Sequence, residues 1–592
     1  MPSPPIKPAA YDFGDLLSIG SFRVPRYQRA YDWDGEQVSD FARDILTVVE
    51  ARLDGEPARH FFGAIISIYE PQQRFEVVDG QQRLTTHMLC LKELRYQWLL
   101  LAEQATQAKK VSIRRSAVKR ADGLQERIFS NGVPRLSLSK RDKDYFSDLL
   151  MDVAREPRRG DDQSHRRLWA ARETLRADLF DPLLAMSPQY AVRVKRLEAV
   201  EDALLSDGYV VHLNTNDGSN AYRLFSVLND RGRPLSVGEL LRTHTLAALE
   251  TYTPQQDAAE VDWDVILRRG DAFVKRFLAA YYVSHVGTRA PTGEMFDRFW
   301  NRFLGDEVAS PSGATRLREK IATLRSEADT FSRLYDGEWP YDDSSKPQWD
   351  QDRLRRLVKA LRHHLADPLL LATARESNEG DFRDLVLRLE LFAFRYINIV
   401  NANAARLGDV YYRHAQIVRA TGRLDKNKLR KELAGLLAVY APDSVFETLL
   451  GEQLRYANKK ARIQLIRHFL TTVEDYEQWF RDGATGKPKP RDKTSLFVLD
   501  NVNIEHVYPQ NPVTGNRLLD NLKHSLGNLT ALDEQEGVRA GNKDFADKKA
   551  VYARSRFQIT KPLGRLTKWD QTSISKRADF YAERAKRIFV VK

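Results

Sequence analysis

The stretch FFGAIISIYEPQQRFEVVDGQQRLTTHMLCLKELRYQWLL (61–100) predicts the fold of the N-terminal part of the chain. Its first ten residues are apolar and β-branched, and RFEVVDG (74–80) follows after three residues, which is typical of a hairpin of two buried strands. Apolar residues over 84–98 then repeat at helical spacing. We therefore expect a strand that ends at 79–80 and a helix that opens at 81–83.

The junction VVDGQQRLTT (77–86) has the composition of a phosphate-binding site. A helix start has free backbone N–H groups and the positive end of the helix dipole, which favour an anion. Arg83 could grip phosphate oxygens, Asp79 could hold a cation or orient a water, and Gly80 permits close backbone approach. Gln81 and Gln82 could read donors and acceptors. The alternative is a polar helix cap with a surface arginine, and the GxxxxGK[ST] motif is absent.

The upstream segment FRVPRYQRAYDWDGEQVSDFARDI (22–45) gathers aromatic and polar residues just after a proline. Such a gathering of aromatic, apolar and polar groups could form a binding surface. The alternative is an irregular segment that packs its aromatics into a core. The candidate residues are Pro25, Tyr27, Gln28, Arg29, Tyr31 and Trp33.

A third segment, LNDRGRPLSVGEL (228–240), predicts a tight turn before a helix. Ser236 lies three residues before Glu239, the spacing of a capping box. Asn229, Arg231 and Arg233 could assist a phosphate site if the fold brings them near the junction at 77–86. The alternative is a plain connection between two helices.

Near the C-terminus, NIEHVYPQNP (503–512), HSLGNLTAL (524–532) and GNKDF (541–545) suggest a hydrolytic centre. Glu505 supplies a hard oxygen ligand and the adjacent His506 a base that titrates near neutral pH. This pair suits metal-assisted hydrolysis of a phosphodiester. The alternative is a core histidine with satisfied hydrogen bonds.

Length and composition indicate a multidomain globular protein. The chain has 592 residues, 42% of them hydrophobic and 29% charged, so about three domains are expected. No apolar run is long enough to span a membrane, no secretory signal is visible, and the single cysteine, Cys90, excludes an intramolecular disulfide. We expect a cytoplasmic protein with no membrane partner.

The net charge of +12 favours a polyanionic partner, although only weakly. Residues 481–592 hold 22 Lys and Arg against 13 Asp and Glu, so most of the excess lies in the last fifth of the chain. Elsewhere, GYVVHLNT (208–215) predicts a strand, and residues 250–480 predict long helices. In RLRRLVKALRHHL an apolar stripe predicts a helix with His363 and His364 at the surface.

Taken together, YQRxYxW, VDGQQRLTT and LNDRGRPLS resemble the N-terminal module of the GmrSD family of modification-dependent restriction enzymes. IEHVYPQNP with LGNLTAL resembles the HNH nuclease module of the same family, and the order matches its fused form. The resemblance implies a predominantly α protein. An α/β ParB- or sulfiredoxin-like nucleotide-binding and modification-sensing module would occupy 1–250, a helical middle 251–430, and a lead-in with the HNH (ββα-metal) domain 431–592. A phosphorothioate-sensing nuclease with the same layout is one candidate for a nearer relative.

The resemblance also implies site residues and cofactors. Residues 79–83 would form the motif that binds and hydrolyses GTP, UTP or ATP. The residues from Pro25 to Trp33 would sense the DNA modification, with aromatic and apolar groups contacting the mark and polar groups holding the phosphate. In the nuclease module His506 would be the general base, Glu505 a ligand of Mg²⁺ or Mn²⁺, and Asn528 the central HNH residue. A second asparagine usually follows the central one by about nine residues, where this chain has Gly537. Asn542 is the candidate substitute as a metal ligand.

These inferences predict a phage-defence DNA endonuclease or nickase that senses modified DNA and is coupled to nucleoside triphosphate hydrolysis. The mark could be a modified base or a sulfur in the backbone. One alternative is a nucleotide-switched DNA-binding adaptor with a degenerate HNH domain, supported by Gly537. A second is a scaffold whose helical middle binds protein. A homo-oligomer stays open, because the sequence does not set the oligomeric state.

Overall fold

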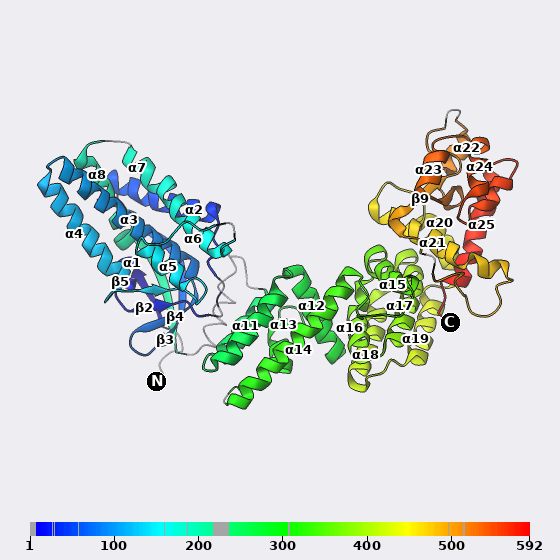
Figure 1. Cartoon of the computed structure of the whole chain (residues 1–592), viewed down its shortest axis with the longest axis horizontal. Coiled ribbons are helices and arrows are strands. Elements are labelled where there is room, and N and C mark those ends of the chain that lie inside the picture. Colours follow the sequence, from blue (N-terminus) through cyan, green and yellow to red (C-terminus); the bar gives the residue numbers. More distant parts are fainter. Residues whose placement is uncertain are drawn as a thin grey trace. The chain divides into compact units, whose positions relative to one another are not determined.

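The computed structural model of the chain divides into two compact units, one of residues 1–235 and 242–250 and the other of residues 236–241 and 251–592. The residues that it describes are 7–26, 28, 30–56, 58–158, 160–185, 188–216, 236–305, 308, 310–494, 496–512 and 515–591. The chain is mostly helical, and its strands are concentrated in the N-terminal unit (Figure 1).

The N-terminal unit is built on a mixed sheet, six-stranded within the described residues, in the order β1-β8-β3-β4-β2-β7. β3 and β4 pair antiparallel, from Glu70 opposite Arg74 to Ile66 opposite Asp79, which confirms the hairpin. β8 confirms the strand expected at 208–215 and lies parallel to β3. The strands are β1 (Lys7–Asp12), β2 (Ser21–Arg23), β3 (His60–Glu70), β4 (Arg74–Asp79), β7 (Leu136–Ser137) and β8 (Gly208–Thr215), and a separate small pair is β5 (Phe129–Ser130) with β6 (Val133–Pro134).

The helix that follows β4 is α3 (Gln81–Gln107), as the sequence predicts. Gly80 precedes it with φ +91°, and a Cβ there would lie 2.9 Å from Cγ1 of Ile65. Both the backbone angle and the lack of space require glycine, so β4 turns directly into α3 against β3. α3 runs beside α4 and also packs on α6 and α8 (Figure 1). The other helices are α1 (Phe13–Leu16), α2 (Gly35–Leu53), α4 (Val111–Ile128), α5 (Lys143–Leu150), α6 (Gln163–Leu175), α7 (Asp181–Ala185), α8 (Tyr190–Asp202) and α10 (Val237–Ala248).

α10 begins with the capping box expected from the sequence. The backbone N–H of Ser236 donates to Oε2 of Glu239 at 2.7 Å, and the N–H of Glu239 donates to Oγ of Ser236 at 3.3 Å. The rest of the third segment, residues 228–235 with Asn229, Arg231 and Arg233, lies outside the described residues.

The second unit begins with a succession of helices. Leu354, Leu357 and Leu361 are buried, as the apolar stripe predicts. His364 is exposed as expected, but His363 is buried and lies 3.0 Å from the hydroxyl of Tyr411, because the helix ends in a turn that brings it inside. The helices are α11 (Thr253–Leu267), α12 (Asp271–Val286), α13 (Met295–Phe299), α14 (Pro311–Asp336), α15 (Gln348–Arg355), α16 (Asp367–Glu376), α17 (Glu379–Ala393), α18 (Ala404–Thr421), α19 (Lys426–Tyr440), α20 (Asp443–Gln453) and α21 (Lys460–Arg481).

The C-terminal part of this unit contains a two-stranded antiparallel sheet of β9 (Val502–His506) and β10 (Leu529–Asp533). The two short strands and following helix expected between Glu505 and Asn542 are therefore present. Phe394 of the middle helices stacks on Phe589 at 4.1 Å between ring centroids, so this part packs on the middle helices. The remaining helices are α22 (Arg517–Leu522), α23 (Glu534–Ala540), α24 (Phe545–Arg554) and α25 (Gln571–Ile588).

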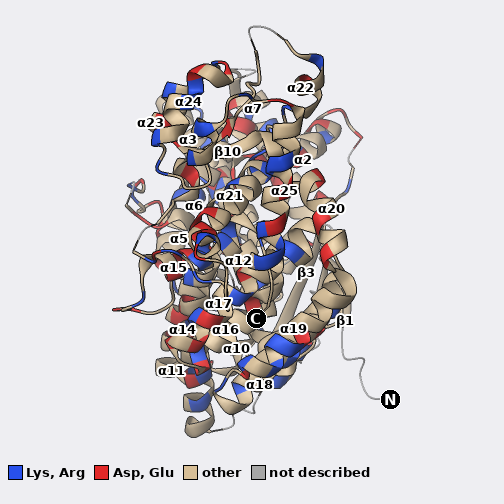
Figure 2. Ribbon diagram, turned by 90° about the vertical axis from the view of Figure 1, so that its right-hand side faces the viewer, with Lys and Arg blue, Asp and Glu red and all other residues tan. Residues whose placement is uncertain are grey.

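Two further observations bear on the choice of partner. Figure 2 shows Lys and Arg positions interspersed with Asp and Glu positions over the ribbon. Net charge alone therefore does not mark a single face for a polyanion. No single helix in the described parts of the chain is long and apolar enough to cross a membrane.

Candidate functional site

The fold brings the two N-terminal segments together at the start of α3. Nε2 of Gln28 donates to the carbonyl of Val78 at 2.9 Å. Oε1 of Gln82 accepts from the N–H of Asp32 at 2.9 Å, and its Nε2 donates to the carbonyl of Ala30 at 3.3 Å. These hydrogen bonds join the segment at 25–33 to the end of β4 and the start of α3.

The segment does not present its aromatics as an open cluster. Tyr31 is 4% exposed, and its hydroxyl lies 2.8 Å from Oγ1 of Thr86. Burial raises the pKa of that phenol. Trp33 is half-buried against Phe41, and Pro25 and Gln28 are buried. These described side chains therefore pack inward instead of forming an open aromatic surface, and the sensing role of the segment stays a prediction. Tyr27 and Arg29 lie outside the described residues.

Arg83 is not the open phosphate clamp that the sequence suggested. Its Nη1 donates to the carbonyls of Ala64 at 2.5 Å and Phe62 at 3.3 Å. Its Nη2 lies 3.6 Å from Oδ2 of Asp79. The guanidinium also covers Gly63, where a Cβ would lie 2.4 Å from Nη1. Arg83 therefore ties α3 to β3, and a phosphate would have to share it with these partners.

The start of α3 retains a feature of an anion site, since no side chain caps it. Gln81 and Gln82 are both buried there, beside Tyr31 and Asp142. Together they line a cavity of about 10 Å³, which is room for about one water. A nucleotide at this point would require the cavity to open.

In the C-terminal part, His506 ends β9 opposite Leu529 of β10. Its Nδ1 lies 3.0 Å from Nε2 of Gln510, and its Nε2 lies 3.3 Å from Nδ1 of His524. The ring of Tyr456 packs edge-on against it at 4.6 Å. Burial, followed by the charges of His524 and two lysines, lowers the pKa of His506 to about 3. The imidazole is therefore neutral at pH 7, the form that can accept a proton, but a pKa this low makes it a weak base in the chain without DNA.

Glu505 does not share a site with His506. Its Oε1 lies 2.7 Å from Nζ of Lys548 and accepts from the hydroxyl of Tyr552 at 2.8 Å. Neighbouring residues in a strand point to opposite faces, so Glu505 faces α24 while His506 faces His524. The expectation that the two act together on one metal is not met.

Asn528 holds the loop after β9. Its Oδ1 accepts from the N–H of Tyr508 at 2.8 Å and from Nε1 of Trp569 at 2.9 Å. Its Nδ2 donates to the carbonyls of Tyr508 at 2.9 Å and Lys523 at 2.8 Å. The side chain is fully buried and all its hydrogen-bonding positions are used. Asn528 is thus a positioning residue rather than a catalytic one.

The residues expected to bind a metal do not fit that role. Nδ2 of Asn542 donates to the carbonyl of Asn511, and its Oδ1 accepts from the N–H of Asn511 at 3.2 Å. Gly537 lies in α23, and a Cβ there would be 2.6 Å from Nδ2 of Asn503. Within the described parts of the chain no group of three or more His, Cys, Asp or Glu side chains could hold a metal ion.

Models of one protein family match the two parts of the chain that contain the candidate sites. The N-terminal domain of the GmrSD restriction endonucleases matches residues 13–246, and the C-terminal domain of these enzymes matches residues 440–584. The chain belongs to the GmrSD family of restriction endonucleases. DNA is therefore its partner, and phage defence its setting. No individual curated protein matches this GmrSD chain.

The sequence reasoning missed several residues around the C-terminal site of this GmrSD chain. His524 opens the segment 524–532 but carried no assigned role, and Gln510 lies four residues after His506. Strand alternation could have separated Glu505 from His506. Lys548 and Tyr552 gave no such signal, because their contact with Glu505 joins positions more than 40 residues apart.

Proposed function

We propose that this GmrSD chain is a nicking endonuclease that hydrolyses DNA phosphodiesters with His506 as general base, under control of the N-terminal unit. The placement of His506 carries the proposal. It is a neutral, buried imidazole at a strand end, with Nδ1 near Gln510 and Nε2 near His524. A general base contributes roughly 10²–10⁴-fold to the rate of such a reaction.

In the proposed reaction His506 carries its own proton on Nδ1, with the side-chain amide of Gln510 turned so that its oxygen accepts from Nδ1. Nε2 of His506 then takes a proton from water as the water oxygen attacks phosphorus. The bond from phosphorus to the leaving oxygen breaks, and that oxygen must receive a proton from solvent or from the protonated imidazole. Nδ1 of His524 contacts Nε2 of His506, the nitrogen that would accept the proton. This contact must therefore lengthen or break when the water binds. Gln510 holds the other side of the ring and fixes its orientation.

We derive no step through the divalent metal that the family resemblance implies. Glu505 is paired with Lys548, and Asn542 is bound to the backbone of Asn511, so neither offers a free ligand. Mg²⁺ or Mn²⁺ would have to be bound by other groups, such as the DNA phosphates. Adding EDTA to the cleavage assay tests this dependence.

For the N-terminal unit we propose nucleotide binding at the start of α3 and recognition of a DNA modification through the segment at 25–33. Two observations support this proposal. The start of α3 has no side-chain cap, and the hydrogen bonds of Gln28 and Gln82 join the two segments. A DNA modification that moves the segment at 25–33 would therefore also change the contacts at the start of α3.

The decisive experiment compares plasmids that differ only in a base or backbone modification, each with and without GTP, UTP or ATP. His506→Ala should abolish cleavage while nucleotide hydrolysis continues, because the two sites lie in different units. His165→Ala, on α6 of the N-terminal unit, is the matched control and should cleave normally. Loss of both activities in His506→Ala would contradict separate sites.

A DNA-binding adaptor without nuclease activity is the second candidate. A side chain at position 537 would collide with Asn503, so the local packing is built around the missing asparagine. This candidate predicts that the wild-type chain binds DNA under nucleotide control yet leaves every plasmid intact. Any cleavage that depends on His506 excludes it.

A further inference from the structure

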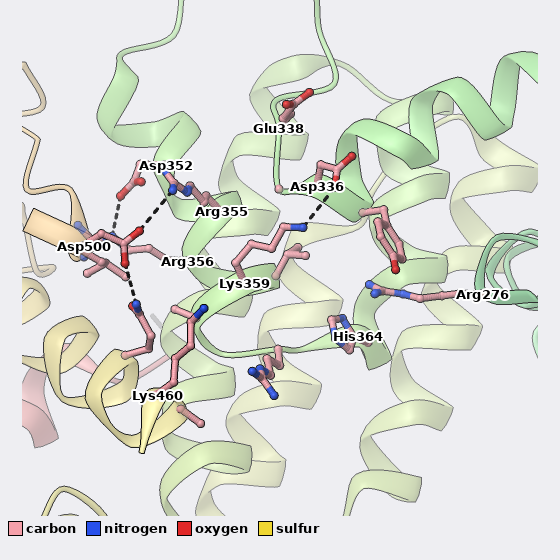
Figure 3. Close-up of a pocket in the computed structure, with 18 residues that line it drawn as sticks. Arg276, Asp336, Glu338, Asp352, Arg355, Arg356, Lys359, His364, Lys460 and Asp500 are labelled. Atoms are coloured by element: carbon pink, nitrogen blue, oxygen red, sulfur yellow. Dashed lines mark hydrogen bonds and ion pairs between the residues drawn. The ribbon is translucent and has the colours of Figure 1, made fainter. Parts of the chain in front are cut away.

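A cavity of about 790 Å³ opens among the middle helices of the second unit, outside both predicted sites (Figure 3). It lies between the end of α14, the turn of helix η5 (Arg356–Ala360), the start of α21 and the short helix η8 (Leu499–Asn501). Its volume is in the range of small-ligand sites, but its lining is rich in charged side chains.

Among the described residues, two cations and one carboxylate of the cavity lining make no ion pair. Three of the four carboxylates have a partner, namely Asp336 with Lys359 at 3.3 Å, Asp352 with Arg356 at 2.7 Å, and Asp500 with Arg355 at 3.7 Å, and the fourth is Glu338. Arg362 and Lys460 also line the cavity, and neither makes an ion pair with any residue that the structure describes. Both side chains are exposed and free to meet a ligand.

These two cations stand where local structure disfavours them. Arg362 has φ +52°, a left-handed backbone that glycine or asparagine adopts more easily. Lys460 is the first residue of α21, next to the positive end of the helix dipole, and no side chain caps that end. The local backbone therefore does not account for an arginine at 362 or a lysine at 460.

His364 reports the positive field in the cavity. Partial desolvation, followed by the charges of Arg276, Arg362 and Lys359, lowers the pKa of its imidazole to about 4. In Figure 3 Lys359, Lys460 and His364 surround one opening. A bound anion would relieve this mutual repulsion.

The cavity is close to the proposed nuclease centre along the chain. The ring of Tyr456 lies 4.6 Å from that of His506, and Lys460 follows Tyr456 by four residues. Four residues span at most about 14 Å, so Lys460 is within roughly four phosphates of a DNA strand that passes His506.

We propose that this cavity binds phosphates of the DNA strand that His506 cleaves, through Arg362 and Lys460. The proposal rests on the proposed nuclease function. Two isolated cations suit diester phosphates, each of which carries one negative charge. A free triphosphate gathers several charges in one place, where the carboxylates of the cavity would repel it.

The test measures DNA affinity in the full chain carrying His506→Ala, so that no cleavage intervenes. Arg362→Gly removes a charge and suits the left-handed backbone, and Lys460→Gln removes a charge that the helix dipole disfavours. Both variants should therefore be at least as stable as the chain that carries His506→Ala alone. Together they should weaken duplex binding several-fold and lower the slope of log affinity against log salt by about 2. Lys275→Gln, on α12 beside Arg276 but outside the cavity lining, is the control and should bind normally.

Unchanged DNA affinity and salt dependence in the double variant would overturn the proposal. Competition with GTP and ATP adds a second arm. If the nucleotides bind the cavity and the variants weaken them but not DNA, the site is a nucleotide site and the proposal is also overturned. Neither result depends on whether His506 cleaves, so failure here is distinct from failure of the nuclease assignment.

Discussion

Nδ1 of His524 lies 3.3 Å from Nε2 of His506 at the end of β9. Tyr456 packs against both rings, with centroids 4.6 Å and 5.7 Å away. Burial lowers the pKa of both histidines, so the pair is neutral at pH 7. A neutral pair lets one imidazole hold the other in position and still leaves a nitrogen able to accept a proton.

Replacing His524 should therefore slow cleavage without abolishing it. We expect His524→Ala to lower kcat about tenfold with little change in KM, against a loss of roughly 10²–10⁴-fold for His506→Ala. His524→Asn, which can keep a hydrogen-bonding group toward Nε2, should recover part of the rate. Plasmid cleavage at several DNA concentrations measures both constants. A wild-type kcat in His524→Ala would show that the contact is not needed.

Lys548 should matter for stability rather than for metal binding. It is buried against Glu505 and also donates to the carbonyl of His506 at 2.8 Å. Lys548→Ala leaves a buried carboxylate unpaired and should cost about 3–5 kcal/mol in the free energy of unfolding. Lys549→Ala, next in the chain and without an ion pair among the described residues, should cost less than about 0.5 kcal/mol. Urea unfolding of both variants measures the difference, and equal costs would contradict the buried pair.

Gly80 should be irreplaceable at the turn from β4 into α3. Its φ of +91° and its contact with Ile65 predict a cost of about 1–3 kcal/mol for Gly80→Ala. Gly123 lies in α4 with nothing within 4 Å, so Gly123→Ala should stabilise the unit by about 0.5–1 kcal/mol. Thermal melting compares the two. A destabilised Gly123→Ala or an unaffected Gly80→Ala would show that the local packing is different.

The stability of the N-terminal unit should fall as pH rises from about 4.5 to 7. Burial, together with the charge of Glu250 and against the opposing charge of Arg23, raises the pKa of Glu76 to about 7. The folded state then holds the proton of Glu76 more tightly than the unfolded state. The contribution of Glu76 to the free energy of unfolding is therefore fully present below pH 4.5 and is lost as the pH rises through about 7. The expected change is about 3 kcal/mol.

Glu76→Gln should flatten this dependence, and Glu103→Gln, at an exposed position of α3, should not. Urea unfolding at a series of pH values measures it. If the wild-type unit is more stable at pH 7 than at pH 4.5, the Arg23 pair outweighs burial and the expectation is wrong.

Local patterns predicted the parts of the fold that depend on local physics. The hairpin, the start of α3 and the capping box of Ser236 and Glu239 follow from side-chain periodicity and turn chemistry over a few residues. The fold also brings the candidate segments at 25–33 and 77–86 together, as the hydrogen bonds of Gln28 and Gln82 show. Their internal roles were less predictable, because whether Tyr31 faces solvent or Thr86 is decided by packing across 55 residues.

The same limit explains the cavity. Its lining comes from positions as far apart as Arg276 and Asp500, and no spacing in the sequence links them. The assignment of Glu505 failed for a different reason. Its partner Lys548 approaches from α24, and only the tertiary fold shows that this charge occupies the face of β9 opposite His506.

The contact between Tyr31 and Thr86 should carry the signal from a DNA mark to the nucleotide site. Oγ1 of Thr86 donates to the carbonyl of Gln82 at 2.9 Å, one turn back on α3, and lies 2.8 Å from the hydroxyl of Tyr31. Thr86→Val leaves the buried hydroxyl of Tyr31 without this partner, which costs about 1–3 kcal/mol and loosens the segment from the helix. The activation of nucleotide hydrolysis by modified DNA should then fall, because the two segments move less together.

Thr106→Val is the matched control for this prediction. Its Oγ1 makes the same type of bond, to the carbonyl of Ala102 at 2.8 Å, but it lies near the end of α3, away from the segment at 25–33. The measurement is the ratio of hydrolysis rates with modified and plain duplex at fixed salt. We expect a lower ratio in Thr86→Val alone. An unchanged ratio in a folded Thr86→Val variant would mean that the mark acts through other contacts, and the hydrogen bonds of Gln28 and Gln82 would be the next to test.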